Sequence, residues 1–184
     1  MAETRIFTYG RLNNLVTKPG QNFLPGAFTN AYGIQYGAGA FALNGVRFEF
    51  GEAVKIAGET NRAYNIERVD GTTTAGQLGV VIRDVVGVRS MEDTIATGPA
   101  KDVPLTIVPF VAPHGWAIAV PLAEGEIPVV GGTVYVGNGE EDTIAGAFYA
   151  TPVVDGTIET EYKFIGLAYN PTSSASQCAI ISKI

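Results

Sequence analysis

The chain has 184 residues, of which 46% are hydrophobic and 16% charged, so it can build a core and is too poor in charge for disorder. Its net charge of −6 argues against a nucleic-acid binder. A single cysteine excludes an internal disulfide, no secretory signal is expected, and no apolar run reaches the roughly 20 residues that span a bilayer.

Residues 1–35 show no helical or strand period, because prolines and glycines interrupt every regular element. From residue 36 the pattern changes to short strands of β-branched and aromatic residues separated by glycine. A bend is expected at Gly51, where an alternating pattern breaks and resumes. The expected strands cover 46–50, 54–56, 63–69, 78–86, 103–107, 116–120, 134–136, 158–164 and 178–184.

The two halves of the chain resemble each other. FGEAVKI matches VGGTVYV at an offset of 80 residues, LGVVIRD matches IGLAYNP at an offset of 87, and YGAGAFALNGVRFEFG is the counterpart of WAIAVPLAEGEIPVVG. The matched segments are 50–56 with 130–136, 78–84 with 165–171, and 36–51 with 116–131. Two copies predict two small barrel or sandwich lobes packed together, or one composite barrel.

The predicted fold is therefore all-β, with two related lobes and an extended, irregular N-terminal arm. The expected divisions are an arm over 1–35, a first lobe over 36–88, a loop excursion over 89–103 and a second lobe over 104–184.

Candidate catalytic and metal-binding residues are few. His114 is the only histidine, no G-x-S-x-G elbow is present, and a thiol pair with Cys178 is no better supported; Cys178 is expected to pack in a late strand. The acidic run at 140–142 lacks calcium-loop spacing and is expected to form a solvated hairpin tip. Glu159 and Glu161 are expected to form the wet side of a strand rather than a catalytic pair.

Phosphate-binding loops are also absent from the sequence, since the nearest G-x-G, at 37–39, has no third glycine at the dinucleotide spacing. The sequence therefore predicts no enzyme, no cofactor and no metal site, and function is sought in surfaces.

The N-terminal segment carries apolar and aromatic side chains that a soluble monomer would not leave exposed. We expect them to form a partner-binding arm, which lies either on its own β domain or on a neighbouring chain. The residues of this predicted contact are Phe7, Tyr9, Leu12, Leu15, Phe23, Leu24, Phe28 and Tyr32.

Nearly the whole chain resembles the cement or decoration proteins of tailed-phage capsids. The phrases that carry the resemblance are NNLVTKPGQNFLPGAFTNA, GEAVKIAGE, LGVVIRD and VVGGTVYVGNGEE. Glu52 replaces the usual aspartate after glycine, and Gly132-Thr133 stands where Gly-Asp is usual.

This resemblance implies a β-rich, often trimeric protein, made in the host cytoplasm, that binds the outer capsid surface of a virion. It further implies that the protein bridges neighbouring major capsid proteins, associates with itself, and contacts neither nucleic acid nor membrane. An alternative is a carbohydrate- or ligand-binding module of a fibre or adhesin, with Trp116, Tyr135 or Tyr149 as stacking platforms. A β-barrel hydrolase that depends on His114 is a third, more remote reading.

Overall fold

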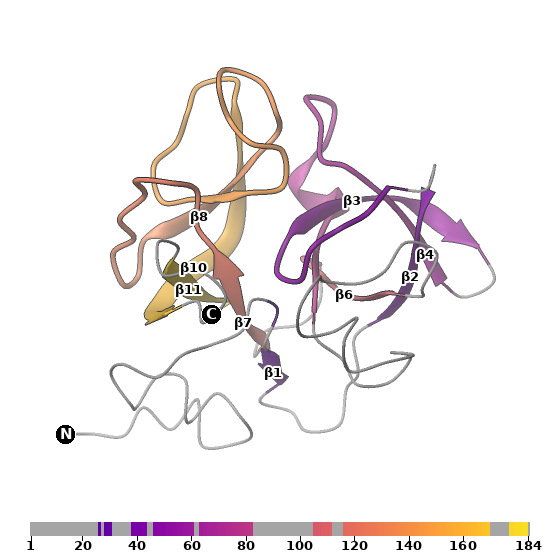
Figure 1. Ribbon diagram of the computed structural model, residues 1–184, viewed down its shortest axis with the longest axis horizontal. Coiled ribbons are helices and arrows are strands. Elements are labelled where there is room, and N and C mark those ends of the chain that lie inside the picture. Colours follow the sequence, from indigo (N-terminus) through magenta and orange to yellow (C-terminus); the bar gives the residue numbers. More distant parts are fainter. Residues whose placement is uncertain are drawn as a thin grey trace.

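The computed structural model describes residues 26, 28–30, 38–43, 46–60, 63–82, 105–111, 116–169 and 177–183. These residues form two β lobes that lie side by side (Figure 1). The strands are β1 Phe28–Asn30, β2 Ala38–Ala42, β3 Ala53–Thr60, β4 Ala63–Glu67, β5 Leu78–Val81, β6 Leu105–Pro109, β7 Trp116–Pro121, β8 Thr133–Gly137, β9 Phe148–Tyr149, β10 Thr157–Tyr169 and β11 Gln177–Ser182, with a short 3-10 helix, η3, at Ala75–Gln77. The all-β prediction with barrel lobes is confirmed.

The first lobe is a closed barrel in the order β2-β4-β3-β5-β6. The second is a six-stranded sheet in the order β1-β7-β11-β10-β8-β9. A parallel bridge between Leu122 and Phe148 joins the end of β7 to β9, so this sheet curls back on itself. The pairing of β6 with β2 and β5 puts 105–109 in the barrel, whereas a boundary at residue 104 groups them with the second lobe.

The lobes repeat one strand plan. β2 and β3 correspond to β7 and β8 at the predicted offset of 80, and the parallel β2–β4 pairing corresponds to the parallel bridge after β7. Gly51 and Gly131 both have positive φ, of 83° and 86°, and their N–H groups donate to Val81 and Phe164, both at 2.7 Å.

These bonds correct the second predicted offset. Val81 corresponds to Phe164, an offset of 83 and not 87. The strand pairing agrees, because Ala53 pairs with Val80 in the first lobe and Thr133 pairs with Lys163 in the second. The predicted offset of 87 instead matches Gly79 with Gly166.

Residues 46–50 do not form the predicted strand, but their side chains alternate between buried and exposed as predicted. Residues 46–49 lie outside any strand, and a turn follows at 50–51, which bears out the expected bend at Gly51. Phe48 and Phe50 are nevertheless buried while Arg47 and Glu49 are exposed. The chain here turns back on itself, since the Glu52 N–H donates to the Glu49 carbonyl and the Glu52 carboxylate accepts from the Glu49 N–H, so no partner strand is needed.

One apolar core runs through both lobes. Val80, Val108 and Phe110 of the first lobe cluster with residues of β7, β8, β10 and β11. The Phe110 ring lies 4.4 Å, centroid to centroid, from the ring of Tyr162. A second cluster, including Phe48, Val54, Ile66 and Ile107, fills the barrel. Because the larger cluster draws on both lobes, we expect them to be stable together rather than separately.

Candidate functional site

Gly26, the first described residue, contacts both lobes. The Gly26 N–H donates to the Ala119 carbonyl of β7 at 2.8 Å, which ties this residue to the second lobe. On its other side Gly26 touches the first lobe: a Cβ there would lie 3.0 Å from the Gly51 nitrogen and from the Val81 oxygen. With φ of 76° and no room for a side chain, this buried position requires glycine. We call the contact of Gly26 with both lobes the seam.

β1 continues from the seam along the free edge of β7. It runs antiparallel to β7, with Phe28 opposite Ile118 and Asn30 opposite Trp116. Figure 1 shows β1 next to β7, below it in this view. The segment thus adds a strand to a sheet edge through main-chain hydrogen bonds, the mode by which extended peptides commonly bind.

Of the eight predicted arm residues, only Phe28 lies among the described residues, where it occupies β1. The other seven lie outside them: Phe7, Tyr9, Leu12, Leu15, Phe23, Leu24 and Tyr32. Gly26 was not among the predicted site residues. Its signal is the Leu-Pro-Gly phrase, which interrupts regular structure and forms part of the resemblance to decoration proteins but indicates no contact with two lobes.

The lobes are also held together by polar contacts near the seam. The Ala53 N–H of β3 donates to the Gly146 carbonyl of the second lobe at 3.0 Å. Glu52 lies beside Gly146 and is only 15% exposed; its carboxylate pairs with Arg68 at 3.5 Å. Burial raises the pKa of Glu52 above its usual value, against the opposing effects of the Glu49 backbone bond and of Arg68.

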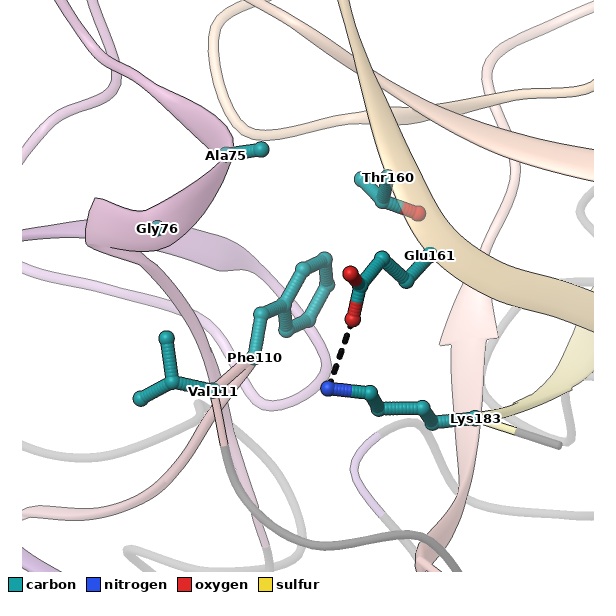
Figure 2. A pocket seen from close by; sticks show the side chains of 7 residues that line it. All are labelled: Ala75, Gly76, Phe110, Val111, Thr160, Glu161 and Lys183. Carbon is teal, nitrogen blue, oxygen red and sulfur yellow. Dashed lines mark ion pairs between the residues drawn. The ribbon is translucent and has the colours of Figure 1, made fainter.

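A small pocket opens between the lobes on another part of their junction (Figure 2). Its volume is about 280 Å³. Phe110 and Val111 supply its apolar wall, and the ion pair between Lys183 and Glu161, at 2.6 Å, spans its other side. Among the described residues that line it, Glu161 and Lys183 are the only titratable side chains, and they pair with each other.

The described candidates for chemistry behave as structural residues. Glu159 and Glu161 are exposed on β10, as expected for its wet side, and Cys178 is buried in the late strand β11. The acidic run at 140–142 lies in the connection of the paired strands β8 and β9, which confirms the hairpin tip. His114 lies outside the described residues.

Within the described ranges no group of three or more His, Cys, Asp or Glu side chains is arranged to hold a metal ion. The same part of the chain contains no helix with the length and apolar character needed to cross a bilayer.

The aromatic residues of the carbohydrate-binding alternative are mostly in the core. Trp116 is 3% exposed and Tyr149 is 8% exposed. The Tyr149 hydroxyl accepts the Ile144 N–H at 2.8 Å, so this ring is held in place from within. Only Tyr135 keeps partial exposure. Two of the three proposed stacking platforms are therefore inaccessible to a sugar.

Among the described residues, the large exposed apolar side chains other than Phe41 of β2 lie on loops, chiefly those of the second lobe. Three of them belong to one connection between β7 and β8, residues 126–130, which we call the apolar loop. The exposed large hydrophobic residues are Phe41, Val111, Ile127, Val129, Val130, Ile144 and Val154.

Comparison with known proteins gives a likeness in fold. A chain of the solved structure titled "The capsid of Myoviridae Phage XM1" aligns with a TM-score of 0.56 at 19% sequence identity. The alignment covers 92% of this chain and 95% of that one, so both lobes are included. No protein-family model and no curated protein matches the sequence. At this identity the likeness shows a shared two-lobed β fold.

Proposed function

We propose that this protein is a structural component of a phage virion. In the proposal it is a cement or decoration protein that binds the outer capsid surface, bridges neighbouring major capsid proteins and stabilises the shell. It is made in the host cytoplasm and acts as a homo-oligomer, which we expect to be a trimer. It needs no cofactor and catalyses no reaction.

The observation that carries this proposal is the end-to-end likeness to a chain of a phage capsid structure. Because the alignment spans nearly the full length of both chains, it concerns the complete two-lobed arrangement rather than one barrel, a motif found in many unrelated proteins. The sequence phrases that resemble decoration proteins point independently in the same direction.

The seam supplies a physical reason for the arm. Gly26 and β1 attach the chain to the second lobe at the point where residues 1–25 end. The predicted contact residues from Phe7 to Leu24 precede that anchor in the sequence, whereas Phe28 belongs to it and Tyr32 follows it. An anchored extended segment adds contact area with many exposed residues, and repeated copies on a symmetric shell bind multivalently.

Co-sedimentation with purified capsids that lack this protein tests the proposal. The full chain should pellet with capsids, and the decorated shells should withstand heating better than bare ones. A variant lacking residues 1–25 retains Gly26 and β1, and should bind more weakly while keeping its circular dichroism spectrum. A full chain that stays in the supernatant at every concentration would exclude the capsid role, whereas undiminished binding of the shortened chain would exclude only the arm.

A further inference from the structure

The duplication provides an internal control for the apolar loop. At the offset of 80, residues 126–130 correspond to residues 46–50 of the first lobe. Both segments lead into the same turn, whose glycine N–H donates to the return strand at 2.7 Å in each lobe. The two loops therefore occupy one position of one strand plan.

The exposed positions of the two loops differ in chemistry. In the first lobe they hold charged residues, Arg47 and Glu49. Their counterparts in the second lobe are Ile127, which is 82% exposed, and Val129, which is 71% exposed. Since the fold accepts charges at these positions, it does not require apolar ones. Their presence on the surface points to contact with another molecule.

The apolar loop is held firmly in this exposed arrangement. The Glu126 carboxylate accepts the N–H groups of Ala150 and Thr151 at 2.7 and 3.0 Å. At the other end the Gly132 N–H donates to the Val129 carbonyl at 2.8 Å. A loop closed at both ends presents its side chains ready for binding, so little conformational freedom is lost when they are covered.

The distribution of charge along the chain indicates which segment could bind the apolar loop. Residues 105–184 carry eight carboxylates and two lysines, a net charge of −6, so the apolar loop belongs to a strongly acidic lobe. Residues 1–25 carry Arg5, Arg11 and Lys18 against the single Glu3, a net charge of +2. The intervening stretches 26–82 and 83–104 each have a net charge of −1. The N-terminal segment thus combines the apolar side chains and the positive charge that this surface calls for.

We propose that the apolar loop binds residues 1–25 of a second copy of this chain. The inference deepens the proposed function, on which it rests for the role of the arm, and it names the arm's contact as the neighbouring copy rather than the shell protein. None of the described residues covers Ile127, Val129 or Val130, whose exposed fractions are 82%, 71% and 72%. A neighbouring copy would be available at every site of a decorated shell.

The decisive variant copies the first lobe. Ile127→Arg with Val129→Glu gives the apolar loop the charges of Arg47 and Glu49, which the equivalent loop already tolerates. The matched control, Ile144→Arg with Val154→Glu, adds the same charges at two other exposed apolar positions, which are 63% and 83% exposed. Light scattering over a concentration series should show about tenfold or greater weakening of self-association for the first variant and little change for the control.

Zero-length carbodiimide coupling then identifies the contacting chain. Lys18 is the only lysine of residues 1–25, and Glu124 lies exposed beside the apolar loop. In an equal mixture of ¹⁵N-labelled and unlabelled full chains, Lys18–Glu124 products should contain both labels, and the Ile127→Arg/Val129→Glu variant should lose them. Products with only one label, no product at all, or an undiminished yield in the variant would each overturn the inference.

Capsid co-sedimentation of the same samples separates this inference from the proposed function. If the wild-type chain pellets with capsids but forms no mixed-label product, only the proposed arm-to-loop contact is refuted. If the wild-type chain forms mixed-label products but does not pellet with capsids, the capsid role is refuted and the proposed self-association is supported.

Discussion

Replacing Gly26 with alanine should destabilise the protein through the seam. An L-residue at φ of 76° costs about 1–2 kcal/mol, and the new Cβ would meet the Gly51 nitrogen and the Val81 oxygen at 3.0 Å. Both are backbone atoms, so relief requires that the lobes move apart. That movement weakens the bond from Gly26 to Ala119, worth about 0.5–1.5 kcal/mol.

Gly125→Ala is the matched control. Gly125 has a similar φ of 82°, but no atom lies within 4 Å of the position its Cβ would take. The control should therefore lose only the conformational contribution, about 1–2 kcal/mol, whereas Gly26→Ala should lose about 1.5–3.5 kcal/mol in total. Any gain from a stiffer unfolded chain is common to both variants and cancels in the comparison.

Urea unfolding of both variants, followed by the fluorescence of Trp116, measures the difference. Trp116 is the only tryptophan and lies in β7, the strand that receives Gly26 and β1, so it reports on the seam. Equal losses of unfolding free energy in the two variants would refute the reasoning, because they would show that the close approach to the first lobe costs nothing.

Three further changes test the shared core and the surface. Phe110→Ala should lower the unfolding free energy by about 3–5 kcal/mol, with Trp116 fluorescence and circular dichroism still changing in one transition; two transitions would contradict a core common to both lobes. Tyr162→Phe should be neutral or stabilise by about 1 kcal/mol, because among the described residues the buried hydroxyl has no hydrogen-bond partner; a clear loss in thermal unfolding would reveal one. The Lys55 ammonium, with neighbouring threonine hydroxyls, holds the pKa of the half-exposed Asp70 carboxyl below its usual 3.8, so this group stabilises the fold above pH 4 and progressively less as the pH falls. Asp70→Asn should therefore lower the unfolding free energy by at most about 1 kcal/mol at pH 7 and by less at pH 3. A loss that is larger at pH 3 than at pH 7 would contradict this pKa shift.

Much of the fold could be predicted because short local sequence phrases determine its turns. The G-x-x-V-x-[IV] phrase encodes a positive-φ glycine followed by a strand, and it identified β3 and β8 at the correct offset. The return strands were misaligned because glycine phrases were matched to each other. The hydrogen bonds match Val81 with Phe164 instead.

The candidate site was harder to predict because it depends on contacts distant in sequence. Gly26 meets Gly51, Val81 and Ala119, and nothing in the Leu-Pro-Gly phrase indicates these partners. The sequence could place an irregular aromatic segment before the first lobe, but it could not show that Gly26 of this segment fits between the two lobes. Only the arrangement of both lobes creates that position.

The residues of the apolar loop could be aligned with their first-lobe counterparts from the sequence, but the alignment alone could not show that they are exposed. VRFEF and EIPVV occupy one strand-plan position, and an apolar residue in either could belong to the core. Burial separates the cases: Phe48 and Phe50 are buried, whereas Ile127 and Val129 occupy the positions of the exposed Arg47 and Glu49, and Val130, the counterpart of Phe50, is exposed as well. In a duplicated fold, features shared by the copies are those the fold requires, such as the turn glycines. An outward position that changes from charged to apolar in one copy is free of that requirement, so its chemistry is best explained by what that copy alone contacts.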